Sequence, residues 1–173
     1  MIFAGRTDLS SPTITAADDV RPLMQGILDS GVHLHHAWSP ETDDGHPHRR
    51  PFQPLPMLDL IDRIGDFDAS LIAYNTQACA RDDRFWLTIP DRLVTSVAAG
   101  APIAIPRHGY AAVKSYLADY PAVLEFETAS DLATALADRS QIARLREAAW
   151  NARGHYDATR HGPKLARFLE RLL

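Results

Sequence analysis

The most chemically informative residues of this sequence lie at the start of a predicted helix. Thr88, Pro90 and Asp91 have the spacing of an N-cap, a first-turn proline and the acid of a capping box. Arg92 follows them, in the first turn of the helix that they predict. A helix N-terminus carries free N–H groups and the positive end of the helix dipole, and an arginine beside it binds phosphate through two parallel hydrogen bonds. The pattern therefore predicts an anion site at this helix end.

A second group of candidate residues follows the next apolar run of the chain, residues 102–105. Arg107 and His108 are basic side chains that can neutralise a phosphate group, and Gly109 lets the backbone approach a ligand closely. In a parallel sheet, ligands bind beyond the carboxyl ends of the strands. We therefore expect these residues to lie at the edge of a sheet that also carries Arg92.

Apolar runs alternate with segments of helical periodicity along the whole chain, which predicts the α/β class. We expect residues 1–173 to form a single Rossmann-like, three-layer domain, in which helices cover both faces of a parallel sheet of about five to six strands. Residues 39–56 are expected to form a long loop, and residues 156–173 to contain the C-terminal helix. The predicted strands cover residues 1–4, 32–36, 69–74, 102–105 and 122–126. The other predicted helices cover about 20–28, 57–64, 90–99, 112–117, 131–137 and 140–152.

The composition narrows the classes of partner. With 173 residues and a net charge of −4, the chain can bury a core but offers no electrostatic reason to bind nucleic acid. Cys79 is the single cysteine, which excludes an internal disulfide framework and fits a reducing compartment. The sequence contains neither a recognisable signal peptide nor a transmembrane segment. We therefore predict a cytoplasmic protein with no nucleic acid among its partners.

Several segments, in order along the chain, resemble a known family. Gly5-Arg6 follows the first predicted strand, Gly31-Val32-His33-Leu34-His35 contains the second, and residues 67–75 read Phe-Asp-Ala-Ser-Leu-Ile-Ala-Tyr-Asn. The last segment is Pro90-Asp91-Arg92-Leu93 followed, after six residues, by Gly100-Ala101-Pro102-Ile103. Together they resemble the C-terminal, nucleotide-sugar-binding half of the two-domain GT-B glycosyltransferases, whose domains are Rossmann-like.

The resemblance implies a nucleotide-sugar substrate, such as a UDP-sugar or GDP-sugar, with no resident cofactor and no bound metal. It identifies no catalytic residue here, because the base or nucleophile of these enzymes comes largely from the other domain. The donor phosphates are expected to contact Arg92, Arg107, His108, Gly109 and Arg6. The ribose or base is expected to contact Thr95, Ser96, Asn75 and His35.

The histidines suggest a second kind of site. His33 and His35 stand two residues apart on a predicted strand, so their side chains share a face. A pair of this kind begins the zinc site of one group of hydrolases, but those enzymes use a barrel that this chain is too short to form. We therefore expect packed or hydrogen-bonded histidines and no metal.

The resemblance implies that this chain has the function of the donor-binding half of an enzyme. The chain would bind the donor of a hexosyltransferase-like glycosyltransferase, which transfers a glycosyl group to an acceptor. The acceptor-binding N-terminal domain is absent from this chain, so we expect a partner subunit or a homo-oligomer to supply it. The alternative is a non-catalytic Rossmann-like binding or interaction module that has lost transferase chemistry. Many retaining members of the family carry a glutamate at the position of Thr95, and retaining members usually carry another just after the glycine loop, where Ala111 and Ala112 stand here; this chain has neither acid.

Overall fold

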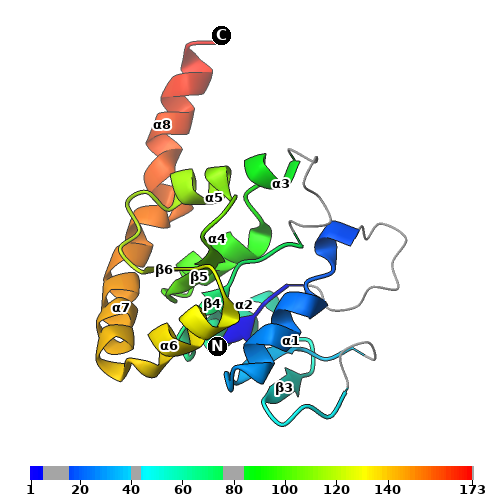
Figure 1. The fold of residues 1–173 in the computed structure, drawn as a ribbon. Coiled ribbons are helices and arrows are strands. Elements are labelled where there is room, and N and C mark those ends of the chain that lie inside the picture. The colour runs from blue at the N-terminus through cyan, green and yellow to red at the C-terminus, as the bar shows by residue number, and fades with distance from the viewer. Residues whose placement is uncertain (6–15, 40–43, 76–83, 173) are drawn as a thin grey trace.

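A computed structural model describes residues 1–5, 16–39, 44–75 and 84–172 of the chain, except for the side chains of Ala17, Arg84, Phe85 and Ala158. In it, a six-stranded sheet runs through the middle of the molecule, and every pair of neighbouring strands is parallel (Figure 1). The strand order is β3-β2-β1-β4-β5-β6. This confirms the predicted α/β Rossmann-like fold with a parallel sheet. The strands are β1 (Ile2–Phe3), β2 (Leu34–Ala37), β3 (Arg49–Phe52), β4 (Ser70–Leu71), β5 (Ile103–Pro106) and β6 (Val123–Phe126).

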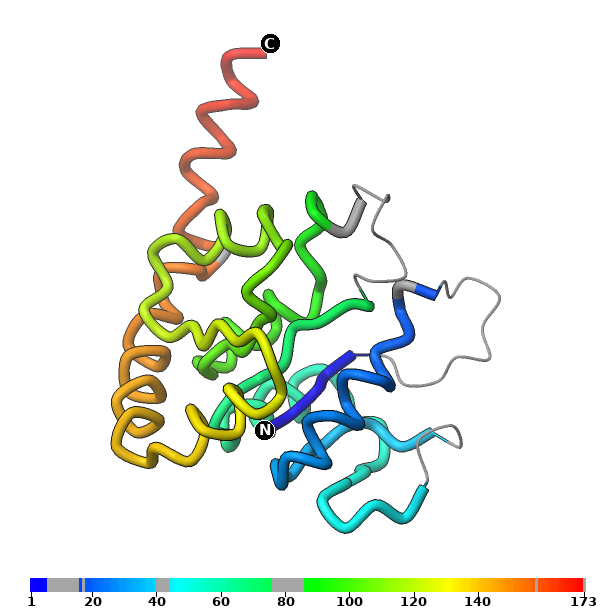
Figure 2. The backbone as a smooth tube through the Cα atoms, in the orientation of Figure 1, coloured from blue at the N-terminus to red at the C-terminus, as the bar shows by residue number. Residues whose placement is uncertain are grey.

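Helices cover both faces of the sheet. The first and sixth helices pack on one face, and the second, fourth and fifth pack on the other, with the seventh along the β6 side (Figures 1 and 2). The eighth helix projects away from the rest of the molecule (Figure 2). The helices are α1 (Arg21–Asp29), α2 (Met57–Gly65), α3 (Arg84–Leu87), α4 (Asp91–Ala98), α5 (Ala111–Tyr116), α6 (Ala129–Ala137), α7 (Arg139–Ala152) and α8 (Ala158–Glu170), with 3-10 turns at Ala16–Asp18 and Arg153–Tyr156.

The core is divided between the two faces as the period-two geometry of a strand requires. Leu71 and Ala73 pack on the side of α1 and α6, whereas Ile72 between them packs on the side of α4 and α5. Both faces of the central strands are buried, which explains why the chain shows continuous apolar runs there rather than alternation.

The structure differs from the prediction in the segment expected as a long loop. Residues 49–52, within the predicted loop 39–56, form β3 and pair with β2 at the edge of the sheet. Arg49, Arg50 and Pro51 give this strand neither an apolar run nor alternation, and an edge strand tolerates a proline because one side of its backbone is unpaired. The loop prediction is therefore wrong for these residues.

The start of α4 also differs from the prediction. Pro90 occupies the N-cap in an extended conformation, and the first helical residue is Asp91. Thr88 is therefore not the N-cap, and no side chain caps the helix. A true capping box stands at α6, where Thr128 and Asp131 each bond to the backbone of the other.

The turn between β5 and α5 adopts an uncommon backbone conformation. Gly109 has φ +86° and Tyr110, the N-cap of α5, has φ +61°. A left-handed conformation is unfavourable for a bulky residue and needs compensation. The Tyr110 side chain provides it, because the ring is 99% buried and its hydroxyl accepts a 2.7 Å hydrogen bond from the backbone N–H of Tyr74. This bond ties the start of α5 to the chain that leaves β4.

We predict that Tyr110→Phe lowers the free energy of unfolding by about 1 to 2 kcal/mol, because the Tyr74 N–H loses its partner. Chemical denaturation followed by circular dichroism measures the effect. Tyr116→Phe is the matched control, since the Tyr116 hydroxyl makes no hydrogen bond to a described residue. Equal stability of the Tyr110→Phe and Tyr116→Phe proteins would contradict the prediction.

Candidate functional site

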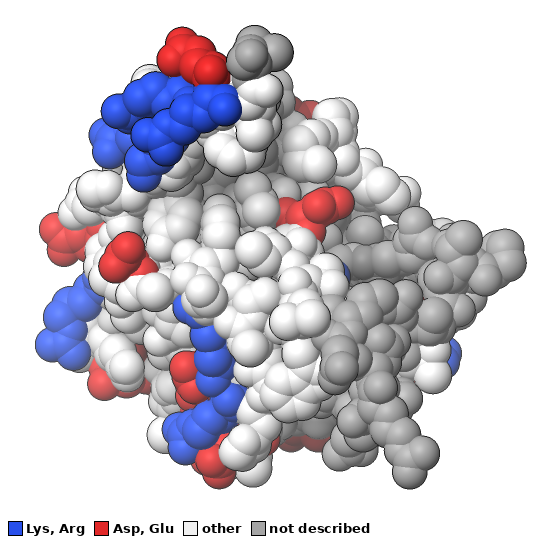
Figure 3. All heavy atoms as spheres, turned by 90° about the horizontal axis from the view of Figure 1, so that it is seen from above, with Lys and Arg blue, Asp and Glu red and all other residues white. Residues whose placement is uncertain are grey.

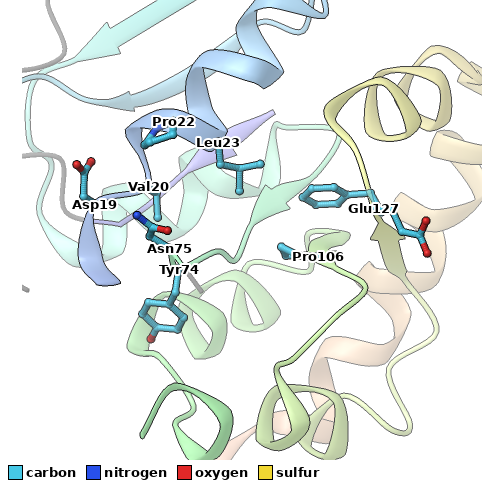
Figure 4. A pocket seen from close by; sticks show the side chains of 9 residues that line it. Asp19, Val20, Pro22, Leu23, Tyr74, Asn75, Pro106 and Glu127 are labelled. Atoms are coloured by element: carbon cyan, nitrogen blue, oxygen red, sulfur yellow. The ribbon is translucent and has the colours of Figure 1, made fainter. Parts of the chain in front are cut away.

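A cleft of about 330 Å³ lies at the carboxyl ends of the central strands (Figure 4). The chain runs from β1 outward through β2 and β3, then returns to the other side of β1 to form β4, so the strand order reverses between β1 and β4. Ligands of open parallel sheets bind at such a switch point. The volume falls in the range of small-molecule sites. The lining residues come from the start of α1 and the ends of β4, β5 and β6: Asp19, Val20, Pro22, Leu23, Tyr74, Asn75, Pro106, Phe126 and Glu127.

The cleft has an apolar middle and polar groups at its margins. Figure 4 shows Asp19 and Asn75 at one margin, Glu127 at the opposite one, and Leu23 between them. Asn75, predicted to contact ribose or base, thus lines the cleft. An amide offers both a donor and an acceptor, which suits the hydroxyls of a sugar or the edge of a base.

Both carboxylates of the cleft are paired with arginines. Asp19 accepts bonds of 2.7 and 2.8 Å from Arg21, and these hydrogen bonds hold the pKa of the Asp19 carboxyl below its ordinary value. Glu127 lies 3.0 Å from the Arg107 guanidinium and 3.8 Å from the His108 ring nitrogen. A carboxylate stabilised in its charged form is a weak proton acceptor. Asp19 is therefore not suited to act as a general base in this arrangement.

Arg107, His108 and Gly109 lie beside the cleft, on the loop that follows β5. Arg107 is 54% and His108 87% exposed at the side chain, so both can reach a ligand at the Glu127 margin. Lys114 donates a 2.6 Å hydrogen bond to the Arg107 carbonyl, which secures the loop from α5. The backbone of Gly109 lies against the exposed Trp86 of α3, since a Cβ built at Gly109 falls 3.7 Å from the indole.

Arg92 lies beneath the cleft and does not line it. Its guanidinium donates a 2.6 Å hydrogen bond to the Ala73 carbonyl and stacks 4.4 Å from the ring centre of Tyr74, with Phe3 5.5 Å away. Burial lowers the pKa of this guanidinium, and its Nε is buried without a hydrogen-bond partner. No carboxylate among the described residues forms a salt bridge with it. Arg92 therefore places a buried positive charge directly behind Tyr74, where the Tyr74 side chain and the Asp18 carboxylate interact with it favourably.

Two other predicted residues point away from the cleft. Thr95 donates to the Asp91 carbonyl and faces Met57 of α2. Ser96 is fully buried and its hydroxyl is shared between Ser70 and the Arg92 carbonyl, so it belongs to the packing of α4 on the sheet. Ribose contacts from Thr95 and Ser96 do not fit these positions.

His35, the remaining predicted ribose or base residue, lies on β2 with its ring 4.6 Å from Phe67. Phe67 precedes β4, so the pair lies toward the amino ends of the strands, opposite the cleft. Desolvation, with the nearby N-terminal amine and Arg63, lowers the pKa of His35 to about 4. His35 is therefore a neutral side chain that packs against Phe67.

The lowered pKa of His35 makes the stability of the folded protein decrease at acidic pH. Because the folded-state pKa of His35 lies below the unfolded value, the unfolded chain takes up a proton first, and stability falls as pH drops from about 6.5 toward 4. We predict that His35→Gln reduces this loss by about 1 kcal/mol, since the group is partly exposed and screened. Denaturation of both proteins at near-neutral and mildly acidic pH measures it. Parallel pH profiles for the two proteins would show that His35 contributes nothing.

Arg6, the fifth predicted phosphate residue, lies outside the described residues. Asp19, Tyr74, Glu127 and Trp86 were missed by the sequence reasoning. Asp19 and Glu127 each follow an element boundary closely, and the sequence carries no signal that distinguishes them from solvent-exposed acids. Tyr74 precedes Asn75 at the end of a buried run, which is a usable signal for a residue at a strand end.

The other histidines of this region form a surface group away from the cleft. The ring of His48 lies 4.8 Å from that of His33 and 5.7 Å from that of His46, before β3. Among the described residues, no group of three or more His, Cys, Asp or Glu side chains is arranged to hold a metal ion. No described helix is both long and apolar enough to span a bilayer.

The fold is similar to parts of solved glycosyltransferase structures. One, titled spinosyn forosaminyltransferase SpnP, superposes with a TM-score of 0.54 and 14% identity over 98% of this chain and 43% of its own. Another, titled as the glycotransferase of kitacinnamycin, gives a TM-score of 0.51 and 13% identity over 96% of this chain and 42% of its own. This chain thus spans less than half the length of either. At this identity the likeness shows the fold, and it confirms the resemblance at that level.

The sequence itself matches no protein-family profile. It also matches no curated protein sequence.

Proposed function

We propose that the cleft binds the nucleotide-sugar donor of a glycosyltransferase, and that this chain is the donor-binding part of such an enzyme. The observation that carries the proposal is the position of the cleft, at the switch point of a sheet shared with glycosyltransferases, beside an exposed basic loop. A UDP-sugar or GDP-sugar is the class of ligand that combines a polar sugar, a diphosphate and an aromatic base.

The proposed roles follow the distribution of polar groups. Arg107 and His108 contact the diphosphate from the Glu127 margin, where a bound phosphate takes over the partner that Glu127 now provides. Asn75 contacts the ribose or the base from the opposite margin. Arg92 acts through Tyr74, since its charge lies beneath the floor and raises the local positive potential.

In glycosyl transfer, the bond from the sugar carbon to the diphosphate oxygen breaks and a bond to the acceptor oxygen forms. Negative charge develops on the departing diphosphate, and donors already in place stabilise it. Arg107 and His108 supply those donors in the proposal. The proton of the acceptor hydroxyl needs a base. Asp19 is held in an ion pair with Arg21, and the proposal assigns the base to the acceptor-binding part of the enzyme.

A binding module without transferase chemistry is the second candidate. The observation that supports it is that the two carboxylates lining the cleft, Asp19 and Glu127, each form an ion pair with an arginine. Such a module would bind the nucleotide and would still transfer no sugar when an acceptor domain was supplied. Turnover of a donor with the acceptor-binding part present separates the two candidates.

We predict that the chain binds UDP or GDP, and that Arg107→Ala weakens the binding about tenfold, the cost of one charge-assisted hydrogen bond. Isothermal titration calorimetry of both proteins gives the dissociation constants. The reason for the loss is that Arg107 is the exposed cation closest to Glu127 at the cleft margin.

Arg144→Ala is the matched control, because Arg144 is an exposed arginine of α7 and forms no salt bridge with a described carboxylate. It should leave the affinity unchanged. Equal weakening in the two variants would reduce the effect to net charge, and absence of heat with either nucleotide would contradict the donor-site proposal itself.

A further inference from the structure

The edge strand β3 is attached to the sheet through a histidine that must be neutral. β3 lies at the end of the molecule away from α8, and its neighbour in the sheet is β2 (Figure 1). His36 of β2 is fully buried, with Nδ1 2.8 Å from the Ala37 carbonyl and Nε2 3.4 Å from Nη1 of Arg49 in β3. Nδ1 needs a proton to bond a carbonyl, and Nε2 must lack one to accept from a guanidinium. Both bonds can therefore form only while His36 is uncharged.

A second histidine shapes the turn that leads into β3. Nδ1 of His46 accepts a 3.2 Å hydrogen bond from the backbone N–H of His48, and its Nε2 lies 3.3 Å from the Asp29 carboxylate of α1. The His46 carbonyl accepts a 3.0 Å hydrogen bond from the Arg49 N–H, so this turn sets the start of β3. Protonation of Nδ1 would deprive the His48 N–H of its acceptor.

The surroundings of His36 oppose its protonation. The Arg49 guanidinium, whose side chain is 8% exposed, is the cation against its ring, and Asp44 pairs with that guanidinium at 2.8 Å. On the same face of the sheet, β1 and α1 contribute apolar side chains such as Phe3 and Met24. Desolvation is the main cause that lowers the pKa of His36; Arg49 lowers it further, while a backbone hydrogen bond and Asp44 act in the opposite direction.

Acid would also add positive charge beside β3. The ring of His33 lies 4.8 Å from that of His48, and desolvation, followed by Arg50 and His48, lowers the pKa of His33. Asp29 is 61% exposed, so solvent screens its attraction for a protonated His46. By contrast, Figure 3 shows a face of the molecule on which Lys and Arg side chains are interspersed with Asp and Glu side chains.

We propose that β3 is a pH-sensitive edge strand, paired with β2 near neutral pH and released from it in mildly acidic solution. Release breaks the bond between His36 and Arg49 and lets the His36 ring take up a proton in water. β3 has four residues, and Arg50 and Pro51 in its middle are exposed, so its release uncovers less apolar surface than the loss of a central strand would. The proposal does not rest on the donor site.

The direction and size of the effect follow from the linkage between protonation and opening. The pKa of His36 in the closed state lies below its ordinary value of about 6.5, so the closed state loses stability as pH falls below that value. Between about pH 7.5 and about pH 5.5, a histidine that is protonated only in the released state raises the population of that state about tenfold.

The test is hydrogen–deuterium exchange of the full chain at these two pH values, followed by mass spectrometry, with labelling times scaled to the intrinsic exchange rate at each pH. We expect peptides covering residues 46–52 to exchange about tenfold faster at the acidic pH. The N–H groups of Ser70 and Ile72, which bond to the carbonyls of Pro102 and Ala104, should stay protected and report on global unfolding.

A matched pair of variants assigns the effect to His36. His36→Gln keeps an acceptor for Arg49 but takes up no proton, so it should remove the tenfold change. His155→Gln, at an exposed histidine of the 3-10 turn Arg153–Tyr156, should leave the change in place. If His36→Gln does not fold, an NMR titration of the His36 ring in the unaltered chain decides, and we expect a pKa below the ordinary value.

Three results would overturn the proposal. The first is equal protection of residues 46–52 at both pH values. The second is a full acid response in the His36→Gln protein, or an ordinary pKa for His36 in the titration. The third is equally faster exchange at Ser70 and Ile72, because the acid would then unfold the whole domain rather than release its edge.

Discussion

The hydrogen bond from the Tyr74 N–H to the Tyr110 hydroxyl joins two parts of the molecule on which the cleft depends. Tyr74 follows β4, and Tyr110 begins α5 after the loop that leaves β5. The bond holds Tyr110 in a left-handed conformation and thereby fixes the direction in which Arg107 and His108 leave the sheet. It also positions the Tyr74 ring, which forms part of the cleft on one side and covers Arg92 on the other.

Both basic and acidic side chains surround the cleft. Arg92 lies behind the floor, and the basic side chains of Arg107 and His108 lie on the rim beside Glu127. Asp19, at the other margin, is paired with Arg21. A bound diphosphate would replace Glu127 as the partner of the rim cations, so binding exchanges one anion for another. Exchange of this kind limits affinity, because the protein gives up an existing ion pair. It also gives selectivity for ligands that carry more negative charge than a carboxylate.

Much of this architecture could be predicted from the sequence, and the reasons for the exceptions are physical. The central strands are buried on both faces, so their apolar runs identify them directly. β3 was not predicted from the sequence. It is an edge strand with two arginines and a proline, and it buries too little apolar surface to show the apolar pattern of a strand. The Thr88 cap failed because Pro90 is extended and the helix starts only after it.

The candidate site was predicted less completely than the fold. The spacing placed Asn75, Arg107, His108 and Gly109 correctly at the carboxyl edge, because the position of a residue after a strand fixes its edge of the sheet. The direction in which a side chain points, however, does not follow from its position after a strand. Arg92 turns inward under Tyr74, and Ser96 turns into the core, because packing of α4 decides which of its faces is buried.

The most direct test of the donor-site account is an NMR titration of the isotopically labelled chain with UDP and with GDP. The account predicts that the backbone amide signals of Tyr74, Asn75, Arg107, His108 and Gly109 shift together and saturate with one dissociation constant, while those of α8 stay unchanged. Shifts confined to another part of the chain, or none from a folded sample at high nucleotide concentration, would contradict it.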